Sequence, residues 1–99
     1  MILVDYMGHM VSTESAEELH NFARILGLKR SWYQSHADHP HYDLTTARMR
    51  MKAVRMGATE TDPVDLLKRA WWYEERNRRI LEALRLKQES KESSHEHES

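Results

Sequence analysis

The chain has 99 residues, of which 39% are hydrophobic and 31% charged, so its size and composition suit one small soluble domain with a modest core. Fifteen basic and sixteen acidic residues leave a net charge of −1, which excludes a global field that attracts nucleic acid or a membrane surface. The absence of cysteine excludes disulfides and thiolate metal sites and fits a reducing compartment, so we expect a cytoplasmic protein.

The chain begins with a predicted buried strand, Ile2-Leu3-Val4, because this run is short, apolar and rich in β-branched residues. It lacks the basic flank of a signal peptide, and no apolar run in the chain approaches the roughly 20 residues that span a bilayer, so we expect no membrane partner. Ser15 then predicts a helix start, with Glu18 completing a capping box, and Gly27 predicts the end of that helix.

The middle of the chain predicts a strand over residues 28–34, where Trp32 and Tyr33 supply β propensity. The histidine-rich segment 35–43 follows, and we expect it to form a loop. After it, Thr45 or Thr46 caps a second helix.

This second helix is expected to run to Met56 and to stop at Gly57, ahead of a short third strand over residues 58–61. The pair Asp62-Pro63 then gives an N-cap followed by proline at the first helical position, which predicts a long helix over residues 62–87.

The order of elements predicts an α/β fold with a small, mostly parallel sheet of about three strands flanked by helices. We expect one domain over residues 1–87, in which the C-terminal helix projects, and a disordered polar tail over residues 88–99. Ligands of open α/β sheets bind beyond the carboxyl ends of the strands, so Asp5, Gln34 and the histidine segment are expected to share one rim.

The segment from residue 36 to residue 43 holds three histidines and two aspartates in eight positions. Alternate side chains of an extended backbone point the same way, so His39, His41 and Asp43 are expected to converge. With Asp5 or His9 from the end of the first strand, they form an N/O ligand set for a divalent metal such as zinc or manganese. The alternatives are a metal-free functional site and a solvated polar loop.

The second predicted helix is basic, because no acidic residue lies between Leu44 and Thr59. A helix N-terminus attracts anions and arginine pairs well with phosphate, so the region suits a phosphate-containing ligand, unless the basic face is simply solvated. The residues expected to bind substrate are Gln34, Tyr42, Thr45 and Arg48.

The long C-terminal helix carries a heptad-like seam. Apolar or small residues recur at spacings of four and three, with Asn77 at an a position that can fix two-stranded register; the seam comprises Leu66, Ala70, Tyr73, Asn77, Ile80 and Leu84. Because the end of this helix outruns a small sheet, we expect a homodimer through it, with an amphipathic helix that folds back on its own domain as the alternative.

A family resemblance is carried by five short stretches of the chain: residues 18–23 (Glu-Leu-His-Asn-Phe-Ala), Leu26-Gly27-Leu28, Trp32, His41-Tyr42-Asp43-Leu44 and Gly57-Ala58. Together with Val4-Asp5 and residues 8–12, they resemble the bacterial and phage family termed domain of unknown function 4031, over roughly residues 1–70. The resemblance implies no activity, but it implies functional positions at Asp5, His9, His20, His41, Tyr42, Asp43 and Arg48. His36 and His39 lie in a linker that looks shorter in other members.

Two function hypotheses follow, and the sequence leaves open whether the protein is an enzyme. The first is a metal- or histidine-dependent hydrolase of a nucleotide or nucleic acid phosphoester, in which Asp5, His41 and Asp43 hold a metal or act as acid and base. The alternative is a non-catalytic module that binds a nucleotide-like ligand or a protein, such as a phage accessory protein. A third interpretation is a His-Tyr-Asp network that only braces the fold.

Overall fold

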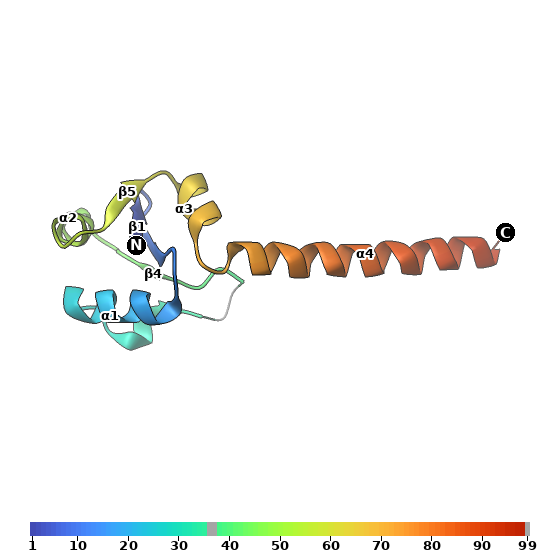
Figure 1. Ribbon diagram of the computed structural model, residues 1–99, viewed down its shortest axis with the longest axis horizontal. Coiled ribbons are helices and arrows are strands. Elements are labelled where there is room, and N and C mark those ends of the chain that lie inside the picture. Colours follow the sequence, from blue (N-terminus) through green and yellow to red (C-terminus); the bar gives the residue numbers. More distant parts are fainter. Residues whose placement is uncertain (36–37, 99) are drawn as a thin grey trace.

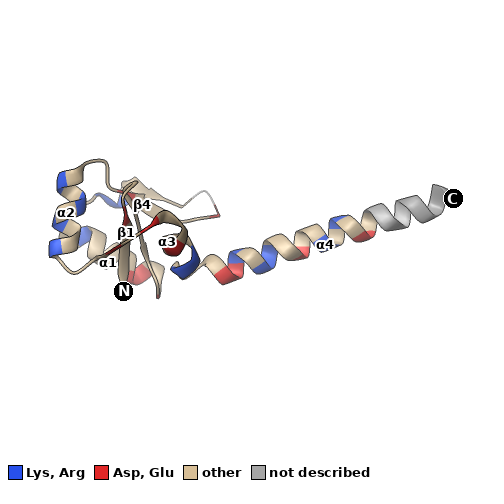
Figure 2. Cartoon of the chain, turned by 90° about the horizontal axis from the view of Figure 1, so that it is seen from above, with Lys and Arg blue, Asp and Glu red and all other residues tan. Residues whose placement is uncertain are grey.

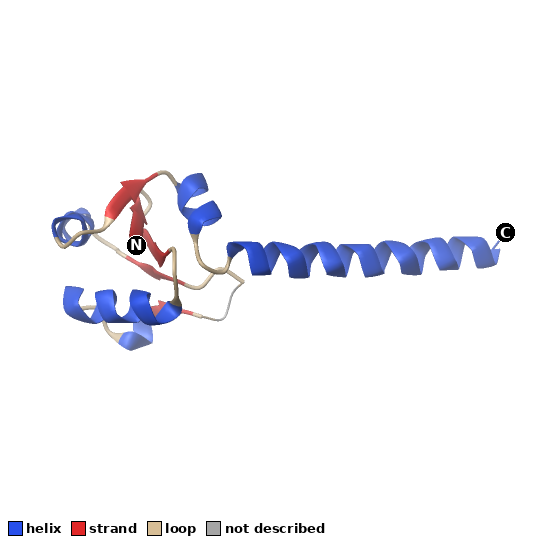
Figure 3. Ribbon diagram, in the orientation of Figure 1, coloured by secondary structure: helices blue, strands red, loops and turns tan. Residues whose placement is uncertain are grey.

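The computed structural model describes residues 1–35 and 38–98 (Figure 1). One sheet has the strand order β3-β4-β2-β1-β5, made of β1 (Ile2–Asp5), β2 (His9–Ser12), β3 (Tyr33–Gln34), β4 (His41–Asp43) and β5 (Thr59–Thr61). The helices are α1 (Ala16–Leu26), the 3-10 helix η1 (Arg30–Trp32), α2 (Ala47–Arg55), α3 (Pro63–Arg69) and α4 (Tyr73–Glu98), as Figure 3 shows. His36 of the histidine segment lies outside the described residues.

The α/β class is confirmed, but the prediction of a mostly parallel sheet of about three strands was wrong. The sheet has five strands and is mixed, because only β1 and β5 pair in parallel. Strand β2 runs antiparallel to β1, since the connection of residues 6–8 is far too short for the crossover that a parallel pair needs. Met10 and Val11, which follow this turn, were the apolar signal for the missed strand.

The turn between β1 and β2 requires glycine. Gly8 has φ +93°, and its carbonyl accepts a hydrogen bond from the Leu44 amide at 2.6 Å, just after β4 ends. A Cβ at Gly8 would lie 2.4 Å from the carbonyl oxygen of Leu44. The close approach at Gly8 therefore connects the first turn of the chain to the end of β4.

The two faces of the sheet carry separate apolar clusters. One face packs against α1 and α2, with Val4, Met10 and Tyr42 of the sheet among its buried residues. The other face packs against α3 and the start of α4, and its cluster consists of Leu3, Val11, Leu66, Ala70 and Trp72. Because side chains alternate along each strand, every sheet residue is assigned to one of these faces.

Local capping signals placed the helices correctly. The side chains of Ser15, Thr46 and Asp62 each accept a hydrogen bond from the backbone amide three residues later, as N-caps do. The capping box at Ser15 is only half formed, because the Glu18 carboxylate instead accepts hydrogen bonds from Ser12 and the N-terminal amine.

The histidine segment and the strand before it differ from expectation. Residues 30–32 form η1 and leave only two residues, Tyr33 and Gln34, in β3, while residues 41–43 are a strand rather than a loop. The reason is tertiary: β4 is held between β2 and β3 by ladders on both sides. A sequence window around residues 35–43 contains no information about these partners.

The predicted helix over residues 62–87 is divided in two. Ala70 leaves the helical region with ψ 142°, the Trp71 amide donates to the Ser12 carbonyl at 3.0 Å, and Trp72 Nε1 donates to the Pro40 carbonyl at 2.9 Å. These hydrogen bonds to the sheet domain replace the helical ones. Helix α4 then projects from the domain (Figure 1). It continues through residues 88–98, for which the composition predicted a disordered tail. The predicted limits of the domain stay a prediction.

Basic and acidic residues both occur along the described part of α4, whereas the charged residues of α2 are all basic (Figure 2). Four apolar residues of α4 are exposed in the single chain: Ile80, Leu81, Leu84 and Leu86. Within the described residues, no helix is both long enough and apolar enough to cross a membrane.

The Gly8→Ala substitution is expected to destabilise the fold by about 3 kcal/mol, because it adds a clash with Leu44 to an unfavourable φ. Gly27→Ala is the matched control, since Gly27 has φ +103° but open space around it, and its cost is expected to be about 1 kcal/mol. Urea unfolding of both variants measures the difference, and equal losses would contradict the clash.

Candidate functional site

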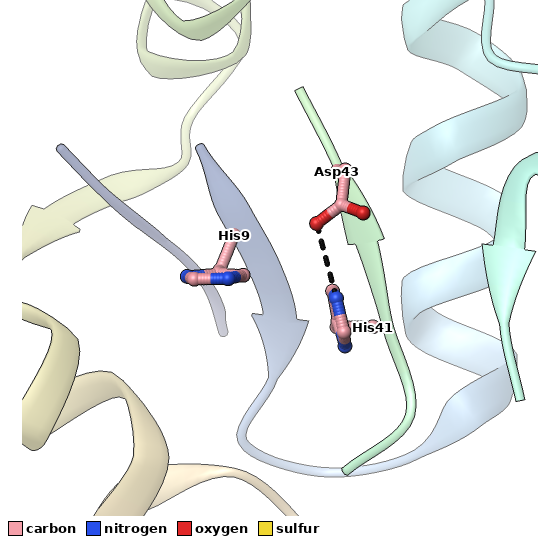
Figure 4. A group of neighbouring side chains, drawn as sticks. All are labelled: His9, His41 and Asp43. Atoms are coloured by element: carbon pink, nitrogen blue, oxygen red, sulfur yellow. Dashed lines mark ion pairs between the residues drawn. The ribbon is translucent and has the colours of Figure 1, made fainter. Parts of the chain in front are cut away.

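The pairing of β2 with β4 brings the polar group of the sheet together. His9 and Asp43 are direct cross-strand partners, and His41 lies two residues before Asp43, so all three side chains project from the same face. On this face α3 packs mainly against β1 and β2. Figure 4 shows the three side chains side by side on the two strands.

The three residues form a group that could hold a metal ion. One ligand atom from each of His9, His41 and Asp43 lies within 4.8 Å of the others. Two imidazoles and one carboxylate suit zinc and several other divalent transition metals. Among the described residues, His39 is not part of this group, although its ring stacks on His41 at a centroid distance of 5.4 Å.

Asp5 is not part of the His9–His41–Asp43 group but contacts the His9 ring from the other side of that ring's ligand atom. Its side chain is 0% exposed, and Oδ1 accepts hydrogen bonds from the backbone amides of Met7 and His9 at 3.0 and 2.9 Å. Its other oxygen lies 2.9 Å from His9 Nδ1. This arrangement fixes the proton of His9 on Nδ1 and leaves Nε2 as the free ligand atom, a common second-layer contact in metal sites.

His41 has an acceptor oxygen at each ring nitrogen. Nδ1 lies 2.6 Å from the His39 carbonyl oxygen, and Nε2 lies 3.0 Å from Asp43 Oδ1. A neutral imidazole carries only one N–H, so it satisfies only one of these contacts. The other oxygen then lies beside a ring nitrogen that carries a lone pair instead of a proton.

A cavity of about 200 Å³ opens next to this group. His9, His39 and His41 line its polar side, and Trp72 with residues of α3 lines its apolar side. Partial burial is the largest effect on the pKa of His39 and lowers it, and the neighbouring His41 and Arg76 lower it further. The His39 ring is therefore neutral near pH 7. Sequence reasoning missed Trp72 at this site, and the Trp71-Trp72 pair directly after α3 was its only signal.

A larger cavity, of about 430 Å³, adjoins Asp43 from the other side. Gln34, Thr45 and Thr46 supply its polar groups, and apolar residues including Trp32 and Met49 complete it. This places two of the predicted substrate-binding residues, Gln34 and Thr45, beside a member of the His9–His41–Asp43 group. The cavity also lies at the N-terminal end of α2, where free backbone amides favour an anion.

The structure separates the other predicted residues from this group. Tyr42 points to the opposite face, where its hydroxyl lies 2.8 Å from His20 Nδ1. Burial raises the pKa of Tyr42, while burial and the Arg30 charge lower the pKa of His20. Arg48 is exposed on α2 and lines neither of the cavities at Asp43 and His41.

Comparison with known proteins gives one match. The family model described as "Protein of unknown function (DUF4031)" matches residues 3–71, which include β2 to β5 and all of β1 except its first residue, and end just before α4. No curated protein and no solved structure matches the chain.

Asp5→Ala is expected to cost about 2–4 kcal/mol of stability, because it leaves the Met7 and His9 amides without their acceptor. Asp5→Asn retains an acceptor oxygen for both amides and is expected to cost about half as much. Chemical denaturation of the two variants checks the order, and an equal loss for both would show that the charge, which both variants lack, matters more than amide capping.

Proposed function

Because the chain belongs to the DUF4031 family, whose description assigns no activity, we propose from its site that the protein is a divalent-metal-dependent hydrolase of a phosphate-containing substrate. The observation that carries the proposal is the pair of contacts at His41. Its Nε2 faces a carboxylate oxygen while its Nδ1 faces a carbonyl, beside a second histidine whose free nitrogen is Nε2.

A metal ion would account for these contacts without an extra proton. His41 Nε2 and an oxygen of Asp43 would hold it, while Nδ1–H of His41 would still donate to the His39 carbonyl. Ligand atoms bound to tetrahedral zinc lie roughly 3.3–3.5 Å apart. The 3.0 Å between Nε2 and Oδ1 is somewhat shorter than this spacing, and the 4.8 Å within which all three ligand atoms lie is longer, so side chains of the group would adjust to hold the ion.

The group has the composition of a catalytic rather than a structural metal site. Three protein ligands leave a coordination position for water or substrate. A metal there would polarise a phosphoryl oxygen and lower the pKa of an attacking water. The neighbouring cavity supplies Gln34, Thr45 and the N-terminal end of α2 to orient an anionic substrate, and the absence of acidic residues from α2 favours that charge.

A non-catalytic binding module is the alternative, and α4 favours it. The exposed side chains of Ile80, Leu81 and Leu84 have no partner within the described single chain. Pairing with a second copy would bury them, and the homodimer through α4 stays a prediction. The cytoplasmic location also stays a prediction. In this alternative the His9–His41–Asp43 group serves binding only.

Titration of the full chain with zinc and manganese is expected to give one site per chain. His41→Ala and Asp43→Asn are each expected to weaken binding at least about tenfold, because each removes a ligand. His20→Asn, on the opposite face of the sheet, is the control and should bind as the wild type does. Calorimetry measures this, with circular dichroism to confirm folding; no binding by the wild type would refute the metal site.

Hydrolysis of the chromogenic diester bis(p-nitrophenyl) phosphate is expected to depend on added metal and to fall about 100-fold or more in Asp43→Asn. Gln34→Ala is expected to raise KM more than it lowers kcat, since Gln34 lines the substrate cavity. Metal binding without turnover of any phosphoester would reject the hydrolase and leave the binding module.

A further inference from the structure

A second polar cavity lies on the α1 face of the sheet, away from the proposed metal site. Its volume is about 150 Å³, and we call it the arginine pocket; its lining residues are His20, Asn21, Arg24, Leu28, Arg30 and Tyr42. Tyr42 forms its inner wall from β4, where it points opposite to His41 and Asp43. The sheet therefore separates this pocket from the His9–His41–Asp43 group.

The lining of the arginine pocket is rich in hydrogen-bond donors and has no acid. Two arginines and one asparagine are among its lining residues, all three of them exposed, and none of its lining residues is Asp or Glu. Within residues 1–35 and 38–90, Arg24 and Arg30 form no ion pair. Two arginines at one small pocket without a carboxylate repel each other, which an anion would relieve.

His20 adds a donor whose orientation is set by the buried part of the pocket. Tyr42 is 1% exposed, burial raises its pKa, and its protonated hydroxyl lies 2.8 Å from His20 Nδ1. In the tautomer of His20 that accepts a hydrogen bond from this hydroxyl, the imidazole proton is on Nε2, the nitrogen directed away from Tyr42. The Tyr33 ring packs edge-on against His20 at 4.4 Å and holds this orientation.

We propose that the arginine pocket binds a phosphate group, with Arg24 and Arg30 neutralising its charge and His20 and Asn21 donating hydrogen bonds. Planar guanidinium groups match phosphate oxygens in pairs. The pocket is smaller than the roughly 300–1,000 Å³ of sites for drug-sized molecules, so it takes the phosphate and not a whole nucleotide. The polar lining residues of this pocket are distinct from the His9–His41–Asp43 group and from the polar residues of the larger cavity, with which it shares only Leu28 among the lining residues.

The test is an NMR titration of the ¹⁵N-labelled full chain, without divalent metal, first with inorganic phosphate and then with glycerol 3-phosphate. Saturable shifts are expected at the side-chain N–H groups of His20, Asn21, Arg24 and Arg30. The double variant Arg24→Gln/Arg30→Gln is expected to weaken binding at least tenfold. Arg79→Gln, at an exposed arginine of α4, is the control for loss of positive charge outside the pocket and should leave the affinity unchanged.

The two ligands distinguish the source of the phosphate: binding of both supports a phosphate monoester ligand, and binding of inorganic phosphate alone supports the free ion. His41→Ala should bind phosphate as the wild type does, so failure of the metal site leaves this result untouched. Absence of saturable shifts, or equal weakening by Arg79→Gln, would overturn the proposal.

Discussion

The antiparallel pairing of β2 with β4 is the constraint on which the candidate site depends. It sets His9 opposite Asp43 and Met10 opposite Tyr42, so polar side chains alternate with buried ones across the pair. A slip of one residue would turn Met10 and Tyr42 out of the core and the histidines into it. The hydrophobic core and the polar group therefore specify the same register, and the Gly8–Leu44 contact closes its end.

The buried carboxylate of Asp5 gives this arrangement its rigidity. A carboxylate that is fully removed from water is costly unless hydrogen bonds compensate it, and here two backbone amides and one imidazole do so. The same three contacts shape the turn and set the tautomer of His9. Folding of the first hairpin and orientation of one candidate ligand are thus a single event, which preorganises the site before anything binds.

The sequence predicted features that depend on neighbouring residues. Ser15, Thr46 and Asp62 marked helix starts because capping is local, and the alternation of His41 with Asp43 placed both on one face for the same reason. Features that depend on distant pairing were not predictable: the partner of β4, the role of Asp5 behind His9, and the break near Trp72, where bonds to Ser12 and Pro40 override helix propensity. At each of these places, tertiary contacts determined which of the locally acceptable backbone conformations the chain adopts.

The projecting helix α4 has a hydrodynamic consequence. The chain measures 63 × 24 × 22 Å with a radius of gyration of 18.0 Å, whereas a compact domain of about 100 residues has roughly 13 Å. An elongated particle diffuses more slowly than a sphere of equal mass. A single chain will therefore elute from a gel-filtration column earlier than a compact protein of the same mass. One chain with α4 extended should therefore elute at an apparent mass above its 11.8 kDa, and light scattering, which measures mass independently of shape, is the appropriate measure of assembly.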